Sequence, residues 1–189
     1  MRPLTVLIDR DGVINRNRND YVKSWEEFEF LPGSIAALKS LAERRAQVIV
    51  VTNQSVVGRG IISLDELEEI HARMRREIER RGAYIDAVFC CPHAPEEGCS
   101  CRKPQPGMLA EALELFDIDP QRCYVVGDSH DDMLAARAIG LPFILVLTGR
   151  GRHELARQWG CSPSLIASDL RAAVRWILRR ERAVEEEAA

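Results

Sequence analysis

Short apolar runs alternate with amphipathic segments along most of the chain. Five runs have the length of a buried strand, at residues 4–8, 47–51, 87–90, 123–127 and 143–147. Segments with apolar residues at helical spacing lie between and after them, at residues 34–45, 63–81, 107–116, 131–139 and 169–182, with a short one around Glu154. Apolar strands that alternate with helices predict an α/β fold, in which helices cover both faces of a parallel sheet.

The predicted elements continue to residue 182. Ser63 and Glu66 form a capping-box motif at the start of the longest helix, and Gly82 follows its end. A short apolar segment at 165–166 precedes the last helix. We therefore expect a single domain over residues 1–182 and a charged, alanine-rich tail at 183–189, where the last helix frays.

Composition and charge narrow the possible functions. The 189 residues include 26 Lys and Arg against 29 Asp and Glu, a net charge of −3, which offers no broad basic surface for nucleic acid. No apolar run approaches the roughly 18 residues of a membrane span. The first predicted strand begins close to Met1, which leaves no room for a signal peptide. We expect a cytoplasmic, monomeric protein that binds neither nucleic acid nor membrane.

Three aspartates directly follow predicted strands. Asp9 and Asp11 follow the first strand, Gly12 allows a sharp turn after them, and Asp128 follows the fourth strand. The carboxyl ends of parallel strands meet at one edge of a sheet, where α/β proteins bind their ligands. A lone Asp-x-Asp is explained equally well by a helix cap or a solvated turn. Three carboxylates at one edge instead form a hard-oxygen site suited to Mg²⁺.

Two further segments carry groups suited to phosphate. Thr52 begins the run Thr-Asn-Gln-Ser at residues 52–55, whose hydroxyl and backbone N–H groups can surround phosphate oxygens. Arg102 and Lys103 place two positive charges just before the helix that begins near residue 107. Each signal alone is weak, because Thr and Asn are common in turns and an Arg-Lys pair is usually an exposed basic turn.

Residues 90–104 contain the motif of a second metal site. Cys91 and His93 form one short chelate, Cys99 and Cys101 form another, and five residues separate the two. Three thiolates and one imidazole predict a closed, tetrahedral Zn²⁺ site. Zinc there should be structural and should order the loop that presents Lys103. The remaining cysteines are expected to be buried small side chains without partners: Cys90, Cys123 and Cys161.

Taken in order, four motifs resemble those of the haloacid dehalogenase-like (HAD) phosphohydrolases over residues 4 to about 150. They are Asp-x-Asp-Gly at 9–12, Thr-Asn at 52–53, Lys-Pro at 103–104 and Gly-Asp at 127–128. The resemblance implies a Rossmann-like three-layer core, with Asp9 as nucleophile and Asp11 as general acid and base. It also implies Mg²⁺ held by the Asp9 carboxylate, the Asp11 backbone carbonyl and the Asp128 carboxylate. Thr52 and Lys103 would stabilise the phosphoryl group.

Within these enzymes, the segment Cys-Pro-His…Cys-x-Cys-Arg-Lys-Pro at 91–104 resembles the branch of D-glycero-D-manno-heptose-1,7-bisphosphate phosphatases. The branch has no large cap domain, and this chain has no room for one, so short loops would recognise the sugar. The resemblance implies Mg²⁺-dependent hydrolysis of the C7 phosphate through an aspartyl-phosphate, in ADP- or GDP-heptose synthesis. The candidate substrate contacts are Asn17, Asn19, Asp20, Tyr21, Asn53, Gln54, Ser55, Arg59, Arg102 and Ser129.

Several neighbouring residues have two interpretations. Ser129 stands where some relatives carry Lys, which leaves its contact with the substrate open. Arg16 and Arg18 either meet the distal phosphate or are solvated. Asp132 either complements the N-terminus of its helix alone or also pairs with the motif lysine or with the waters of the metal. His71 is expected at the surface or in packing rather than in catalysis.

Other functions share part of this pattern. Histidinol-phosphate phosphatases of the HAD type resemble the same branch, but a cationic substrate favours acids around the site, whereas arginines at 16, 18, 59 and 102 favour a bisphosphate. A phosphomutase generally needs a cap that excludes water. A receiver-like phosphorylation switch also uses a strand-end Asp with Thr and Lys, but it has no zinc loop. A zinc-finger interaction module would leave the strand-end carboxylates unexplained.

Overall fold

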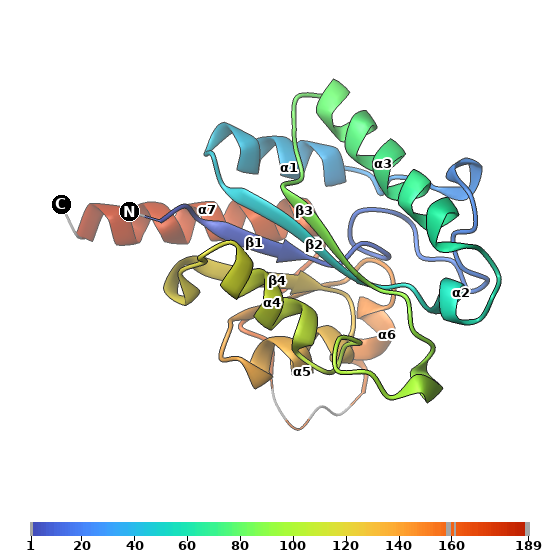
Figure 1. Ribbon diagram of the computed structural model, residues 1–189. Helices are drawn as coiled ribbons and strands as arrows, with labels where there is room; N and C mark the ends of the chain where they lie inside the picture. Colours follow the sequence, from blue (N-terminus) through green and yellow to red (C-terminus); the bar gives the residue numbers. More distant parts are fainter. Residues whose placement is uncertain (1, 158–159, 161, 188–189) are drawn as a thin grey trace.

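The computed structural model describes residues 2–157, 160 and 162–187. The described residues form a six-stranded parallel sheet in the order β3-β2-β1-β4-β5-β6 (Figure 1). The strands are β1 (Thr5–Ile8), β2 (Gln47–Asn53), β3 (Ala87–Cys91), β4 (Cys123–Gly127), β5 (Phe143–Val146) and β6 (Leu165–Ala167). Because β1 lies between β2 and β4, the residues that follow these three strands meet at one edge of the sheet.

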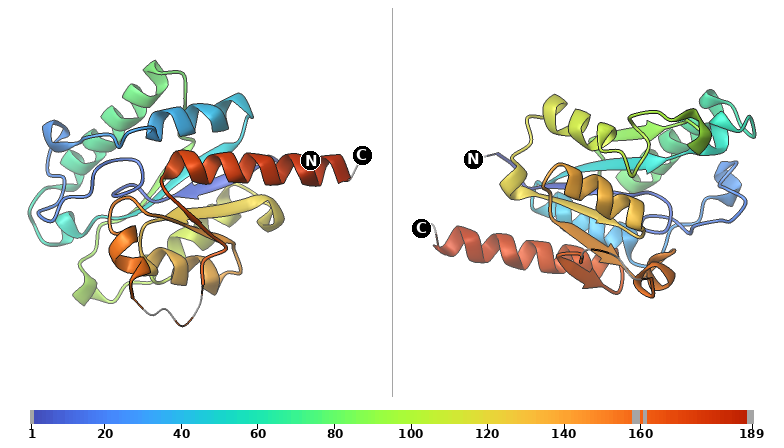
Figure 2. Two further views of the ribbon diagram at one scale, coloured as in Figure 1. Left: turned by 180° about the vertical axis from the view of Figure 1, so that it is seen from behind. Right: turned by 90° about the horizontal axis from the view of Figure 1, so that it is seen from below.

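Helices cover both faces of the sheet, which gives three layers. On one face lie α1 (Ser34–Glu43), α3 (Leu64–Arg80) and α7 (Leu170–Glu187), and on the other lie α4 (Gly107–Leu115) and α5 (His130–Ala138) (Figure 1, Figure 2). Two short helices follow β2 and β5: α2 (Ser55–Gly58) and α6 (Gly151–Leu155). The 3₁₀ turns are η1 (Trp25–Glu27), η2 (Pro95–Glu97) and η3 (Pro120–Arg122). The predicted α/β architecture is confirmed.

Alternate side chains of the central strand enter two separate cores. Val6 and Ile8 pack with the apolar side chains of α1, α3 and α7, whereas Leu7 packs with those of α4 and α5. None of the three side chains is exposed. Burial on both faces explains why the strand is apolar throughout, and it makes β1 a rigid support for the residues that follow it.

The start of α3 was predicted correctly. Ser63 Oγ accepts a hydrogen bond from the Glu66 backbone N–H at 3.2 Å, and the Glu66 carboxylate accepts one from the Ser63 N–H at 2.7 Å. This reciprocal capping box satisfies two N–H groups that the first helical turn leaves without partners.

The last helix extends further than the sequence pattern predicts. The sequence pattern ends the last predicted helix at residue 182, and α7 continues to Glu187. Arg122 donates hydrogen bonds of 2.9 Å to Glu181 and to Glu185, and the Tyr124 hydroxyl donates one of 2.8 Å to Glu181. These contacts come from residues about sixty positions earlier, so the local pattern of the helix could not indicate them.

The cysteines outside the predicted zinc ligand set differ in burial. Cys123 is buried as expected, whereas Cys90 is only half-buried, so the prediction of a buried side chain there was wrong; both are free thiols. Cys161 lies outside the described residues. Among the helices that the structure describes, none combines the length and the apolar character needed to cross a bilayer.

Candidate active site and metal centres

A cavity of about 220 Å³ lies at the carboxyl ends of the central strands. It is lined by all but one of the predicted catalytic, magnesium and substrate residues: Asp9, Asp11, Asn17, Asn19, Tyr21, Thr52, Asn53, Gln54, Ser55, Arg59, Arg102, Lys103, Asp128 and Ser129. The exception is Asp20, whose carboxylate pairs with Arg18 at 3.1 Å and with Lys23 at 2.7 Å. The strand order thus gathers residues that are more than a hundred positions apart in the sequence.

A buried ion-pair network forms the floor of this cavity. Lys103 Nζ donates to Asp9 Oδ1 at 2.9 Å, to Asp132 Oδ1 at 2.5 Å and to the Val51 carbonyl at 2.7 Å. Of the two interpretations of Asp132, pairing with the lysine is therefore correct. Ser129 caps α5, and its hydroxyl donates to Asp132 Oδ2 at 2.5 Å. Because all three donors of the ammonium are used, Lys103 is fixed beside Asp9.

The floor carries more negative than positive charge. One carboxylate oxygen from each of Asp9, Asp128 and Asp132 lies within 4.8 Å of the others. The ammonium group of Lys103 forms ion pairs with two of them, Asp9 and Asp132. Burial is the main reason that the pKa of Asp9 rises to about 7. Burial and the two neighbouring carboxylates raise the pKa of Asp128 well above its usual value. Three crowded carboxylates, two buried and one half-buried, offer the oxygen ligands that suit a hard divalent cation such as Mg²⁺.

Two glycines bring separate loops into contact around Asp128. Gly12 and Gly149 both adopt positive φ, 84° and 53° respectively. A Cβ atom at either position would collide with the Asp128 carboxylate, and one at Gly149 would also meet the backbone of Gly12. The next residue, Arg150, donates its backbone N–H to Asp128 Oδ2 at 2.7 Å. The chain can therefore enclose this carboxylate only because neither glycine has a side chain.

Three side chains donate hydrogen bonds to Asp11. They come from Arg10, at 3.1 and 2.9 Å, from Asn15 at 2.8 Å and from Gln54 at 2.6 Å. Although burial acts in the opposite direction, the charge of Arg10 and these hydrogen bonds lower the pKa of Asp11 below its usual value. Gln54 also donates to Thr52 Oγ1 at 2.8 Å. The predicted substrate residue Gln54 thus links the candidate acid to the candidate phosphate-binding hydroxyl.

Arg10 is a functional candidate that the sequence analysis missed. Its side chain is fully buried, and Nη1 lies 3.0 Å from Nε2 of His71 on α3. His71 is 8% exposed, so of its two predicted places, packing is correct and the surface is wrong. Burial and the nearby charge of Arg10 lower the pKa of His71 to about 3. An arginine between two aspartates ordinarily indicates an exposed turn, so only the fold reveals this contact.

The neutral state of His71 predicts how stability depends on pH. Its folded pKa of about 3 lies below the unfolded value of 6.5, so the unfolded chain takes up the proton first as the pH falls. This contribution to stability is complete above pH 6.5 and decreases by about 1.4 kcal/mol for each pH unit below it. His71→Gln removes the titration. Urea unfolding at pH 7 and pH 5 should show wild type losing roughly 2 kcal/mol more than the variant.

The same comparison can refute the assignment. Acid weakens other interactions in both proteins equally, so only the difference between wild type and His71→Gln reports on this group. Identical losses in the two proteins would mean that His71 titrates in the folded protein as it does in the unfolded chain.

Asn53 connects the end of β2 to the loop that carries Lys103. Its side-chain amide donates to the Lys103 carbonyl at 2.9 Å and accepts from the Lys103 backbone N–H at 3.0 Å. These two hydrogen bonds use one donor and the acceptor of the amide. Although Asn53 lines the cavity, its main contacts therefore position the lysine.

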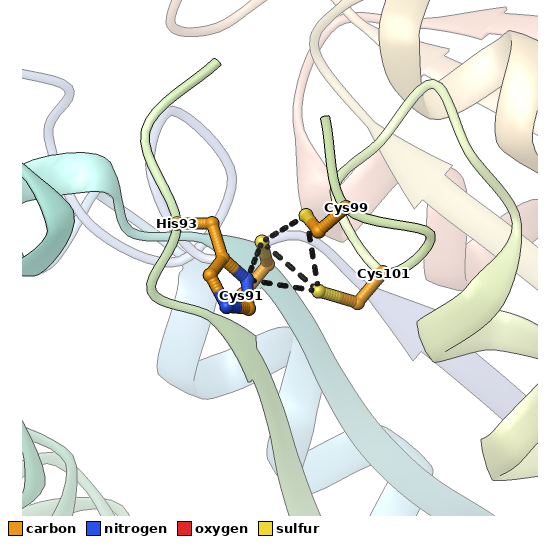
Figure 3. A group of neighbouring side chains, drawn as sticks. All are labelled: Cys91, His93, Cys99 and Cys101. Atoms are coloured by element: carbon orange, nitrogen blue, oxygen red, sulfur yellow. Dashed lines mark hydrogen bonds between the residues drawn. The ribbon is translucent and has the colours of Figure 1, made fainter. Parts of the chain in front are cut away.

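The four predicted zinc ligands converge in a loop beside the cavity (Figure 3). Their sulfur atoms are 3.2 to 3.5 Å apart, and His93 Nδ1 lies 3.5 Å from Cys91 Sγ and 3.3 Å from Cys101 Sγ. Zn–S bonds of about 2.3 Å would place the sulfur atoms about 3.8 Å apart. Cys91, Cys99 and Cys101 are free thiols, not joined in disulfides. The cluster thus needs to expand by only a few tenths of an ångström to hold zinc.

Arginines occupy the walls of the cavity. Arg18, Arg59, Arg102 and Arg150 all line it, whereas Arg16 forms an exposed pair with Glu29 at 2.8 Å. Of the two arginines considered at 16 and 18, only the second therefore faces the cavity. Two of the four wall arginines have partners in the zinc loop: Arg59 pairs with Glu96 at 3.3 Å, and Arg102 donates to the His93 carbonyl at 3.2 Å.

Comparison with known proteins agrees with this geometry. A family model described as HAD-hyrolase-like matches residues 100–173. The D-glycero-beta-D-manno-heptose-1,7-bisphosphate 7-phosphatase of Pseudomonas aeruginosa is 40% identical over 174 residues, which are 92% of this chain and 97% of that protein. The D-glycero-alpha-D-manno-heptose-1,7-bisphosphate 7-phosphatase of Mycobacterium bovis is 40% identical over 136 residues, 71% of this chain and 72% of that protein.

A solved structure gives the same assignment. The crystal structure of D,D-heptose 1,7-bisphosphate phosphatase from B. bronchiseptica, complexed with magnesium and phosphate, matches with a TM-score of 0.90 at 38% identity. The match covers 93% of this chain and 98% of that one. The chain therefore belongs to the haloacid dehalogenase-like hydrolases and, within them, to the family of D-glycero-D-manno-heptose-1,7-bisphosphate 7-phosphatases.

Proposed function

We propose that the protein removes the C7 phosphate of D-glycero-D-manno-heptose 1,7-bisphosphate in a magnesium-dependent reaction. The product would enter the synthesis of ADP- or GDP-heptose for the cell envelope. The observation that carries the proposal is the contact of 2.9 Å between the Asp9 carboxylate and Lys103 Nζ on the floor of a cavity with arginine-lined walls. A carboxylate beside a fixed positive charge is suited to attack on a phosphate group, and this supports the proposal.

Asp9 is the nucleophile of the proposed reaction. Its carboxylate attacks phosphorus and forms an aspartyl-phosphate, which divides the transfer into two easier steps. Magnesium held by Asp9, Asp128 and the Asp11 backbone carbonyl would offset the repulsion between the carboxylate and the phosphate. Asp132 lies close enough to add a carboxylate to this set, although it also binds Lys103.

Lys103 and Thr52 stabilise the transferred phosphoryl group. Although burial opposes its charge, the carboxylates of Asp132 and Asp9 raise the pKa of Lys103 above its usual value, so the ammonium stays protonated. A fixed ammonium stabilises the charge that develops on the phosphoryl oxygens during transfer. Thr52 is buried at the end of β2, where its hydroxyl is oriented by Gln54.

Asp11 handles the proton in both halves of the reaction. An incoming phosphate adds negative charge next to Asp11, which favours the protonated form of its carboxyl group. The acid then donates its proton to the leaving sugar oxygen, and the resulting carboxylate accepts a proton from the water that hydrolyses the aspartyl-phosphate. Because a phosphate ester has a leaving oxygen that accepts this proton, a site with a general acid suits phosphate esters.

The second phosphate of the substrate would meet the arginines of the cavity wall. Guanidinium groups bind phosphate through paired, charge-assisted hydrogen bonds. Arg18 lies on the loop at residues 16–21, Arg59 at the end of α2 and Arg102 on the loop between β3 and α4. These short segments would replace a cap domain in recognising the sugar.

We infer that Cys91, His93, Cys99 and Cys101 hold a structural zinc ion. Their spacing and their mutual distances support this assignment. A closed set of four ligands leaves no position for substrate. The ion would fix the loop between β3 and α4, which ends at Arg102 and Lys103, so its role is to support the site from one side.

A substrate comparison tests the proposal. Purified enzyme with Mg²⁺ should release phosphate from heptose 1,7-bisphosphate with a kcat/KM at least about tenfold higher than from fructose 1,6-bisphosphate or histidinol phosphate. Histidinol phosphate lacks the second phosphate, and fructose 1,6-bisphosphate carries its second phosphate on a different sugar framework. Phosphorus NMR should identify heptose 1-phosphate as the product. Both anomers belong in the assay, because the relatives include an alpha and a beta enzyme. Faster hydrolysis of histidinol phosphate would refute the substrate assignment.

A further inference from the structure

The middle residue of the Asp9-Arg10-Asp11 motif is a buried arginine that the proposed reaction does not use. Burying a guanidinium is costly unless its charge and N–H groups have partners. Nη2 of Arg10 donates to both carboxylate oxygens of Asp11, and Nη1 contacts His71 Nε2 at 3.0 Å, whereas Nε is buried without a hydrogen-bond partner. The ring of Phe28 covers the guanidinium at 5.9 Å. Arg10 therefore lies between the general acid and a histidine of α3.

His71 determines how this guanidinium is oriented. A guanidinium has only donors, so Nε2 of His71 must accept, which requires the neutral ring with its proton on Nδ1. A protonated ring would place two positive charges in contact. The hydrogen bond to Nη1 fixes the rotation of the planar guanidinium, and this rotation directs Nη2 at Asp11.

Arg10 in turn determines the tilt of the Asp11 carboxyl group. Asn15 and Gln54 each contact one oxygen of Asp11, whereas Arg10 contacts both. Without an acceptor at His71, Nη1 would become a buried donor without a partner, and rotation of the guanidinium would relieve that cost. The same rotation would take Nη2 away from Asp11. A displacement of about 1 Å at a reacting group can lower the rate about 100-fold.

We propose that Arg10 and His71 form a buried positioning pair that fixes the direction in which Asp11 presents its proton to the leaving oxygen. The inference rests on the proposed function, in which Asp11 is the general acid. It adds two residues that do not touch the substrate, one of them on a helix outside the four motifs. They are positioning residues, because each acts through another side chain.

The choice of leaving group separates this role from a general structural one. A sugar alkoxide is a poor leaving group and requires a proton, whereas p-nitrophenolate leaves without one. Misdirecting Asp11 should therefore slow the first half of the reaction, departure of the leaving group, much more for an alkyl phosphate than for p-nitrophenyl phosphate. Damage to the fold, to metal binding or to the nucleophile would slow both reactions together.

The test compares three variants of the full chain on these two substrates. His71→Leu removes the acceptor at similar volume, and His71→Gln restores an acceptor oxygen near the position of Nε2. Tyr124→Phe removes a buried hydrogen bond to Glu181 at the opposite end of the sheet and serves as the matched control for destabilisation. As the alkyl phosphate we choose the sugar phosphate that wild type cleaves fastest. The ratio can then be measured even if the proposed heptose substrate is incorrect.

We expect the ratio of kcat/KM on the alkyl phosphate to kcat/KM on p-nitrophenyl phosphate to fall at least tenfold in His71→Leu. This quantity reports on the steps up to departure of the leaving group and not on the later hydrolysis of the aspartyl-phosphate, in which Asp11 acts for both substrates. The ratio should return to within about threefold of wild type in His71→Gln and stay unchanged in Tyr124→Phe. Asp11→Asn gives the upper limit of the change in ratio. An equal loss on both substrates in His71→Leu would overturn the inference, as would a failure of His71→Gln to restore the ratio.

A second measurement does not depend on activity. Nitrogen-15 NMR of the histidine rings distinguishes the two neutral tautomers, and we expect His71 to carry its proton on Nδ1. Finding the proton on Nε2 would show that no hydrogen bond from Arg10 is accepted there, and the positioning pair would be refuted whatever the substrate.

Discussion

Replacing Asp9 with asparagine should lower the rate of phosphate release by about four orders of magnitude, since an amide cannot form the covalent intermediate. The shape of the side chain is retained, and the amide oxygen can still accept the hydrogen bond from Lys103. Burial raises the pKa of Asp9 to about 7, so the charged form of this group opposes folding in the metal-free protein. We therefore expect Asp9→Asn to melt at least as high as metal-free wild type at pH 8.

Phosphate release and thermal unfolding, measured on the same preparations, check this prediction. Asp117→Asn is a suitable control, because Asp117 is exposed, pairs with Arg2 far from the cavity and has a positive φ of 47° that asparagine tolerates. The control should keep wild-type activity. A rate for Asp9→Asn within tenfold of wild type would exclude Asp9 as the nucleophile.

Loss of the proposed zinc ligand Cys91 should have the largest effect on stability. In Cys91→Ser we expect bound zinc to fall from about one ion per chain to nearly none. If the ion contributes about 3 to 4 kcal/mol, Tm should drop by about 10 °C. Displacement of the loop before Lys103 should lower activity by roughly tenfold to a hundredfold. Elemental analysis, thermal unfolding and phosphate release measure the three effects.

The neighbouring cysteine provides the matched control for this experiment. Cys90 precedes Cys91 on β3 and is not one of the four clustered ligands. Cys90→Ala should therefore retain one zinc ion per chain. Fully folded, active protein without zinc, in wild type or in Cys91→Ser, would contradict the structural role of the ion.

Local pattern and motif order predict the main architecture. Apolar strands followed by helices indicate a parallel sheet, and a parallel sheet places Asp9, Thr52 and Asp128 at one edge. Cys91 and His93 are close in sequence to Cys99 and Cys101. That the four side chains converge could therefore be predicted without knowing the fold. In each case the predicting signal is contained in one segment or in a general rule of sheet topology.

Features that depend on specific long-range contacts could not be predicted. The burial of Arg10 requires His71 from α3, sixty-one positions away. The extra length of α7 requires Arg122, and the orientation of Asn53 depends on the backbone of Lys103. Asp20 was expected among the substrate contacts with its neighbours in the loop, but it is not among the residues that line the cavity, and its carboxylate pairs with Arg18 and Lys23.

The close approach of Gly12 and Gly149 around Asp128 limits how this scaffold can change. Gly60, Gly98 and Gly140 also adopt positive φ, but a Cβ atom there would meet nothing within 4 Å, so their replacement costs only local backbone strain. At the two enclosing positions a single methyl group would displace a carboxylate of the reaction centre. Libraries for altered specificity should therefore vary the loop at 16–21 and residues 94–98 and keep both enclosing glycines invariant.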